Sequence, residues 1–350
     1  MGDAYTAVAD DETTLFYNPA ALGRHRGVTI YALRSNLEVP DVVDTNLSLT
    51  NFSVGLSDQF DNFPKEPELI ADKILGQPLY LQLSGNFGLK VLNFGMNFFA
   101  TSRTELVLEN AIHPKLNLDY RLDRGFIAGG ALNFGSGAQG KNPTGRVTSL
   151  GFGLKIMNRQ GLKNSFNLYG TELLDIISNS DNYKAIRDGL GYSKGSGYGF
   201  DLGVEHNIYS GPTRYTFGLS LLDAFDTKFK KESGINEVPQ QDQSLNSGFS
   251  FNQDFKIFDY TLAADIHNII DPSASFGSKI HFGARARIPF LNIYTGWNGG
   301  YMSWGVGLKL FVFDLNVGFY GIEAGKSYQQ KESERAVISL NLADINFLAF

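Results

Sequence analysis

The stretch Tyr198–Glu205, which reads YGFDLGVE, decides the fold class because its two faces differ so strongly. Large apolar residues alternate with glycine and acidic residues along it: Tyr198, Phe200, Leu202 and Val204 against Gly199, Asp201, Gly203 and Glu205. Strict alternation is typical of a β-strand with two different environments. A soluble β-sandwich also alternates, but its polar face meets bulk water and has little reason to use so much glycine. Glycine with charge suits the crowded interior of a closed barrel.

The same alternation recurs along the chain, at 150–156, 260–266, 280–288 and 304–310. The apolar face often carries an aromatic residue near a strand end, as at Tyr198, Tyr260 and Trp304. Transmembrane barrels place girdles of aromatic residues at the two membrane interfaces. The pattern therefore favours a barrel in a membrane over a soluble all-β binding protein.

The sequence predicts an all-β fold, a closed antiparallel transmembrane β-barrel with short helices in its loops. We expect about 14 strands, with about 16 as the alternative, because single-chain barrels usually have an even number. The candidate strands lie near 28–34, 45–56, 79–88, 91–102, 115–122, 124–134, 147–157, 197–207, 213–221, 246–253, 258–267, 279–288, 291–298, 302–311, 313–322 and 335–343. Three insertions, 57–77, 159–196 and 223–245, interrupt them; the first two contain helix-like stretches and the third is polar and turn-rich.

Composition excludes several classes of protein. The 350 residues include no cysteine, which removes disulfides and thiolate metal sites. A net charge of −6 argues against nucleic acid as a partner. The mean hydropathy is −0.14, and no apolar run approaches the ~18 residues that a membrane-spanning helix needs. The 39 glycines and 28 phenylalanines are both high and suit a barrel.

The N-terminal segment, residues 1–27, precedes every strand candidate and does not alternate. Residues 2–22 read GDAYTAVADDETTLFYNPAAL. This stretch resembles the N-terminal segment of the long-chain fatty-acid outer-membrane transporter (FadL-type) superfamily, in which it forms a hatch inside the barrel. The resemblance implies the lower strand count, a division into a plug (1–27) and a barrel (28–350), and passive uptake of hydrophobic small molecules such as fatty acids. It also implies that movement of Asn18, Pro19 and Ala20 opens the path.

Charged residues provide the other candidate site. Asp10 and Asp11, followed by Glu12, are expected either to pair with an inward-facing Arg285, Arg287, Lys155 or Lys309, or to form a solvated acidic turn. A second polar cluster is expected inside the barrel, formed by Asp265, His267, His281, Arg285 and Arg287. We interpret it as a salt-bridge network rather than a hydrolytic centre. The sequence shows no convincing nucleophile and base, so we expect no enzyme activity, no metal and no cofactor.

The chain ends on Phe350 after an amphipathic stretch in which alternation slips near 343–346, so a bulge is one interpretation. A terminal aromatic residue resembles the signal read by the outer-membrane assembly machinery. We therefore expect a bacterial outer-membrane protein whose signal peptide is absent from this sequence. Its expected partners are that machinery, outer-membrane lipid and a hydrophobic small molecule. The alternative function is structural: a barrel, possibly a homo-oligomer, that scaffolds a complex or organises lipid.

Overall fold

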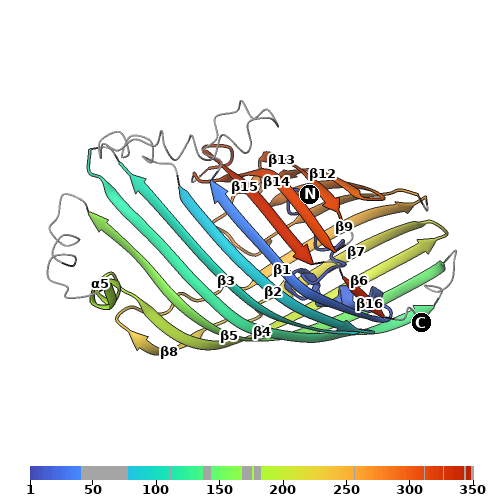
Figure 1. Cartoon of the computed structure of the whole chain (residues 1–350), viewed down its shortest axis with the longest axis horizontal. Helices are drawn as coiled ribbons and strands as arrows, with labels where there is room; N and C mark the ends of the chain where they lie inside the picture. Colours follow the sequence, from blue (N-terminus) through green and yellow to red (C-terminus); the bar gives the residue numbers. More distant parts are fainter. Residues whose placement is uncertain are drawn as a thin grey trace.

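The computed structural model describes residues 1–40, 78–110, 112–136, 143–167, 176, 183–255, 257–310, 312–325, 327–342 and 344–347. These residues form one antiparallel sheet that curls round and closes on itself (Figure 1). The strand candidate at 45–56, the helix-like stretches at 66–75 and 171–177 (apart from residue 176), and Phe350 lie outside the described residues.

Fourteen strands make up the closed barrel, which confirms the predicted fold class and strand number. They are β1 (Val28–Pro40), β2 (Leu79–Val91), β3 (Phe94–Glu109), β4 (Lys115–Ser136), β5 (Thr144–Asn167), β6 (Ser193–Ser210), β7 (Thr213–Leu222), β9 (Ser244–Asp254), β10 (Asp259–Ile266), β11 (Ile280–Ile288), β12 (Leu291–Asn298), β13 (Tyr301–Lys309), β14 (Phe313–Glu323) and β15 (Glu332–Leu342). Two short strands, β8 (Phe229–Gly234) and β16 (Ile345–Phe347), pair with β6 and β1 respectively.

The structure corrects two of the predicted elements. Residues 115–122 and 124–134, predicted as two strands, are one continuous strand, β4. The expected loop at 223–245 contains β8, a charged strand, FKKESG, that lacks apolar alternation. It forms because the start of β6 extends far enough to pair with it.

The first and last barrel strands pair directly and form the seam of the barrel. Arg34 of β1 lies opposite Asn341 of β15, and Ile30 lies opposite Ile345 of β16. Both pairs belong to the same register, so the interruption between β15 and β16 is not a bulge. A register shift lies instead on the other side of β1, between Tyr31 and Arg34, where β1 pairs with β2.

The barrel is apolar outside and polar inside, the reverse of a soluble protein. On β6, Tyr198 and Phe200 are 67% and 55% exposed, whereas Asp201 and Glu205 are fully buried. The described residues contain no helix with the length and hydropathy to cross a membrane. A closed barrel can nevertheless sit in lipid because each of its fourteen strands pairs with a neighbour on both sides.

Short turns connect the strands at one end of the barrel, whereas the other end carries the longer connections together with the two-residue turn between β12 and β13. The turns after β2, β6, β11 and β13 belong to the first end, together with the start of β1. The connections after β3, β5, β7, β10 and β14 belong to the second end. Outer-membrane barrels place short turns in the periplasm and long loops outside.

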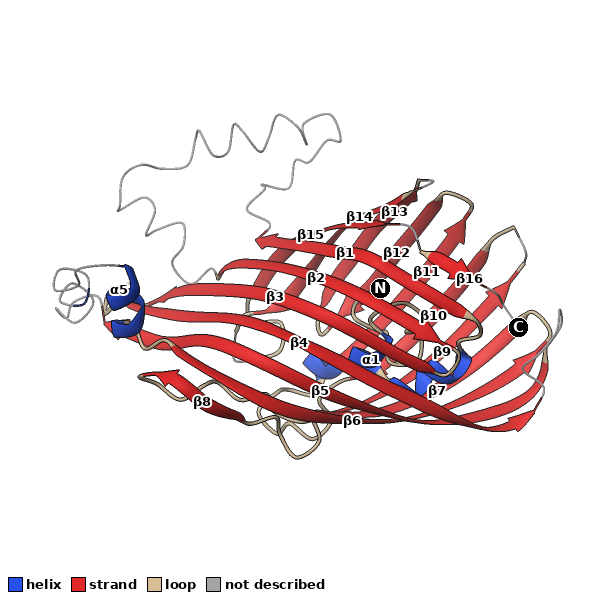
Figure 2. Cartoon of the chain, turned by 60° about the horizontal axis from the view of Figure 1, so that its bottom comes forward, coloured by secondary structure: helices blue, strands red, loops and turns tan. Residues whose placement is uncertain are grey.

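The wall of the barrel differs in height around its circumference. β4 and β5, with 22 and 24 residues, make one wall much taller than the wall of β10–β12, where strands have 8 or 9 residues (Figure 2).

The N-terminal segment packs against the inner faces of the strands. It consists of turns, one helical turn α1 (Thr14–Tyr17) and a 3-10 helix η1 (Pro19–Arg24), and the chain then enters β1 at Val28. Although Ala4, Ala7 and Val8 have the spacing of one face of a helix, the chain forms turns rather than a helix there. Two further short helices, α5 (Tyr183–Gly189) and η2 (Gly277–Lys279), lie between strands.

Candidate functional site

Inward-facing glycines form the surface on which the N-terminal segment docks. A Cβ atom at Gly151 of β5 would lie 2.1 Å from the Ala20 nitrogen, and one at Gly203 of β6 would lie 2.1 Å from Asn18 Oδ1. At Gly283 of β11 the same atom would lie 2.5 Å from the Met1 oxygen. These glycines therefore allow backbone to approach backbone, which explains the glycine-rich polar face of the strands.

Asn18, Pro19 and Ala20 form the tightest part of this docking surface. All three residues are buried. The Asn18 side chain accepts a hydrogen bond from the Ala20 nitrogen at 3.0 Å and so caps η1, with proline at the first position of that helix. Asn18 Nδ2 also contacts the carbonyl oxygens of Thr6 and Val204, each at 3.4 Å. One side chain thus joins two parts of the segment to the barrel wall.

Buried charged side chains make the other contacts between the N-terminal segment and the barrel wall, through an ion pair and hydrogen bonds. Arg24 Nε lies 2.8 Å from Glu205 Oε1, and both side chains are almost fully buried. Lys90 of β2 donates to Thr14 Oγ1 at 2.7 Å. On the opposite wall, Asp265 Oδ2 accepts the backbone N–H groups of Tyr5 and Thr6 at 2.8 and 2.7 Å. Breaking a buried pair of this kind by removing one partner typically costs about 3–5 kcal/mol.

The polar cluster expected from the sequence divides into two groups. Asp265 on β10, His267 just after it and His281 on β11 lie together, and the two imidazole rings stack with their centres 4.4 Å apart. Asp3 of the N-terminal segment joins them, with Oδ2 3.3 Å from His267 Nδ1. Burial alone would lower the pKa of His267, but hydrogen bonds to Asp265 and Asp3 outweigh it and raise the pKa to about 10.

The second group contains Arg285 and Arg287, which face Asp10. The distances from their guanidinium nitrogens to Asp10 Oδ2 are 3.4 and 3.6 Å. Arg287 also pairs with Asp259 on the neighbouring strand at 2.8 Å. Asp11 accepts hydrogen bonds from the Tyr5 hydroxyl at 2.7 Å and from Thr13.

The two lysines proposed as partners for Asp10, Asp11 and Glu12 have other neighbours. Lys155 lies between Asp201 and Asp223, at 2.9 and 2.8 Å. Lys309 ends β13, opposite Asp314 of β14.

Glu12 has a partner that sequence reasoning missed, Arg34 on β1, with Arg34 Nε 3.4 Å from Glu12 Oε2. Burial, reinforced by the neighbouring Asp11, raises the pKa of Glu12 to about 8 despite this arginine. Asp3 was missed as well. No local pattern distinguishes Arg34 or Asp3, because their contacts join positions that are far apart in the sequence.

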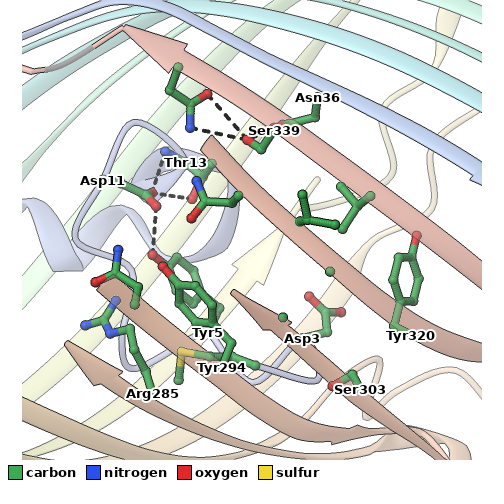
Figure 3. Close-up of a pocket in the computed structure, with 18 of the residues that line it drawn as sticks. Asp3, Tyr5, Asp11, Thr13, Asn36, Arg285, Tyr294, Ser303, Tyr320 and Ser339 are labelled. Atoms are coloured by element: carbon green, nitrogen blue, oxygen red, sulfur yellow. Dashed lines mark hydrogen bonds between the residues drawn. The ribbon is translucent and has the colours of Figure 1, made fainter. Parts of the chain in front are cut away.

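A cavity of about 870 Å³ lies between the N-terminal segment and the inner faces of β1 and β11–β15. Figure 3 shows Asp3, Tyr5, Asp11 and Thr13 on the side of the segment, facing residues of the barrel wall. Polar and apolar surface contribute about equally to the lining, which includes carboxylates of the segment and the wall as well as several arginines and tyrosines: Arg34, Arg285, Arg287, Arg335, Tyr31, Tyr294 and Tyr320. Its volume falls within the range of about 300–1,000 Å³ that is usual for ligand pockets.

Two arginines in this cavity have a donor without a partner among the described residues. The Nε–H groups of Arg285 and Arg335 are buried and have no acceptor within hydrogen-bond distance among the described residues. A buried N–H group without an acceptor costs about 1–3 kcal/mol. A carboxylate is the group that a guanidinium binds best, because its two oxygens match two parallel N–H groups.

A closed barrel with an apolar outer face, a polar interior and an enclosed N-terminal segment defines a transmembrane β-barrel of the outer-membrane type. No protein-family model matches the sequence, and no curated protein sequence matches it.

Solved structures with related backbones include the toluene transporter TodX from Pseudomonas putida, with 10% identity over 98% of this chain and 95% of that one, and a TM-score of 0.43. They also include the transport unit of the autotransporter AIDA-I from Escherichia coli (10% identity, 99% and 98% coverage, TM-score 0.40). CdiB from Acinetobacter baumannii is 12% identical over 92% of this chain, with a TM-score of 0.38, and this chain spans 60% of its length. These likenesses concern the barrel fold and carry no functional argument.

Proposed function

We propose that this protein is an outer-membrane channel for passive uptake of hydrophobic small molecules with a carboxylate head, such as fatty acids, and that the N-terminal segment gates it. The observation that carries the proposal is the cavity beside the segment, which contains two arginines with unsatisfied donors. A lining that combines apolar surface with several charged side chains does not suit a plain hydrocarbon. It does suit an amphipathic acid whose carboxylate replaces the missing acceptor.

The gate in this proposal is the turn at Asn18, Pro19 and Ala20. It packs on Gly151 and Gly203 with no room for a side chain, and one asparagine supplies its hydrogen bonds to the segment and the wall. Moving this turn away from β5 and β6 would join the cavity to the end of the barrel that carries the short turns. Asn18→Ala should therefore increase uptake.

The test is uptake of radiolabelled oleate by cells that lack their own fatty-acid channel and produce this barrel in the outer membrane. We expect uptake above the empty-vector level, an increase with Asn18→Ala, and a decrease of at least fivefold with the double variant Arg285→Gln/Arg335→Gln, which is about 1 kcal/mol of lost binding. Arg121→Gln is the matched control. Arg121 pairs with Asp119 on its own strand, away from the cavity lining. Uptake equal to the empty vector, with the folded barrel present in the membrane, would refute the proposal.

A structural role is the second candidate, and the density of buried contacts that hold the N-terminal segment favours it. Arg24–Glu205, Lys90–Thr14 and Asp265 with two backbone N–H groups fasten the segment on opposite walls. A barrel that never opens would scaffold a complex or organise lipid through its apolar outer face. Native mass spectrometry from mild detergent distinguishes the two roles. A defined oligomer that retains phospholipid and does not exchange oleate supports the structural role.

A further inference from the structure

A carboxylate and two imidazoles meet where the start of the N-terminal segment reaches β10 and β11. One ligand atom each from Asp3, His267 and His281 lies within 4.8 Å of the others. Asp3 Oδ2 and His267 Nδ1 are 3.3 Å apart. The edge of a tetrahedron with metal–ligand bonds of 2.0–2.2 Å is about 3.4 Å, so this spacing matches two ligands of one Zn²⁺ ion.

Each of the three side chains has an outer partner that fixes its orientation. His267 Nε2 lies 3.2 Å from Asp265 Oδ2, and His281 Nδ1 lies 3.0 Å from the Gly2 carbonyl oxygen. The Tyr17 hydroxyl donates to Asp3 Oδ1 at 2.8 Å. Metal-binding histidines characteristically donate their second ring nitrogen to a carboxylate or a backbone carbonyl, and metal-binding carboxylates are themselves hydrogen-bonded. The cluster has this complete outer set of contacts.

The backbone at the start of the segment is held in an unusual conformation that delivers Asp3 to the histidines. Gly2 and Asp3 have φ angles of 56° and 61°, in the left-handed region. A Cβ atom at Gly2 would lie 2.5 Å from the Phe282 oxygen and 2.6 Å from the Trp297 nitrogen, so only glycine fits there. Backbone strain of this kind persists where the surrounding structure enforces it, and it often marks a functional site.

We propose that Asp3, His267 and His281 bind a Zn²⁺ ion, with Asp265, Tyr17 and the Gly2 carbonyl as the outer contacts. Two imidazoles and a carboxylate without a thiolate suit zinc, and solvent supplies a fourth ligand. The Asp3 side chain is 44% exposed and lines the cavity, so an ion can reach the site. The ion would take the place of the proton that His267 holds between the same carboxylates.

The site joins the N-terminal segment to the barrel wall. Asp3 belongs to the segment, whereas His267 and His281 belong to the β10–β11 end with the longer connections, the outer end in a barrel of this type. A bound Zn²⁺ ion would therefore hold the start of the N-terminal segment at the extracellular end of the barrel. This inference concerns the binding of the ion and does not depend on what the barrel transports.

The experiment is a titration of the detergent-purified full chain, without a histidine tag, with Co²⁺ as a spectroscopic substitute, followed by displacement with Zn²⁺. We expect one equivalent of Co²⁺ to give the intense visible absorption of a tetrahedral site. Asp3→Asn and His281→Gln should each weaken Zn²⁺ binding by about 100-fold or more, and Tyr17→Phe, which removes an outer contact, by about 10-fold.

His206→Gln is the matched control, because His206 is bonded to Thr148 on a different wall and should leave binding unchanged. The heat-dependent gel mobility of each variant establishes that its barrel is folded. Failure of the unaltered protein to bind one equivalent of Co²⁺ or Zn²⁺ would overturn the proposal. So would undiminished binding in folded Asp3→Asn and His281→Gln.

Discussion

Single glycines decide whether the N-terminal segment can dock. A side chain on β5 or β6 at the docking surface would occupy the position of Asn18 or of the Ala20 backbone. A rotamer change cannot relieve this steric overlap, because the obstructing atoms belong to the backbone or to a hydrogen-bonded asparagine. The residue scale therefore offers a direct test of how firmly the segment is held.

We predict that Gly203→Ala weakens docking of the segment by about 1–3 kcal/mol, because its Cβ would overlap Asn18. Trypsin cleavage after Arg24 or Arg26 measures the released population, which should rise about 5- to 150-fold. Gly85→Ala is the matched control, since the nearest atom to its Cβ is 3.9 Å away. Equal cleavage rates in the two variants would show that the contact at Gly203 does not hold the segment.

Glu12 should make docking depend on pH. Its pKa is about 8 in the docked state and 4.5 ordinarily, so the docked state holds a proton that the released state loses. The contribution of Glu12 to docking is complete below pH 4.5, decreases as the pH rises, and is lost above about 8. The ratio of the trypsin cleavage rates of the unaltered protein and Glu12→Gln should therefore increase by about tenfold or more between pH 5 and 8. A ratio that stays constant, or that falls, contradicts the assigned burial of a protonated Glu12.

Among the elements, the seam between β1 and β15 is the pairing on which closure of the barrel depends. Asn36 lies opposite Ser339 across it, and both side chains face the cavity. Opposite residues of antiparallel strands have Cα atoms about 4.5–5.5 Å apart, which suits a disulfide.

The double variant Asn36→Cys/Ser339→Cys should therefore oxidise to a disulfide in an otherwise cysteine-free chain. The measurement is a change of gel mobility that a reductant reverses. Asn36→Cys/Ile338→Cys should not cross-link, because a shift of one residue places the second cysteine on the outer face. Cross-linking of the second pair in preference to the first would place the seam in another register.

The strands were predictable because alternation is a local signal that each strand repeats. The signal fails where a strand leaves the membrane. The charged run Asp119–Arg124 lies within β4, which the sequence divided into two strands, and β8 has no apolar face at all. The site was predictable only in part. Asp265, His267 and His281 are close in sequence or on adjacent strands, whereas Asp3 reaches them from about 260 residues away, as Tyr5 reaches Asp265. Without a fold, no pattern connects them.

At the scale of the whole molecule, the apolar outer face is the property that places the barrel in lipid. Phe200→Arg should reduce the free energy of unfolding by about 2–4 kcal/mol if the residue lies near the membrane midplane, because the arginine would replace a lipid-facing side chain that is 55% exposed. Denaturant titration of the barrel folded into lipid vesicles measures this change in the free energy of unfolding. Phe225→Arg is the control, since Phe225 lies in the β7–β8 connection and is 86% exposed. If Phe200→Arg and Phe225→Arg both reduced the free energy of unfolding only slightly, the outer face of β6 would not lie against lipid.

The seam also determines the order of events during assembly. The N-terminal segment contacts walls from β2 to β12, yet the chain enclosing it closes only when β15 meets β1. A segment left outside at that moment faces an unbroken ring of hydrogen bonds on every side. It must be threaded before the last strand is added, and afterwards it can leave only lengthwise through an open end. The segment that precedes β1 is thus committed to its final compartment by the pairing of β15 with β1.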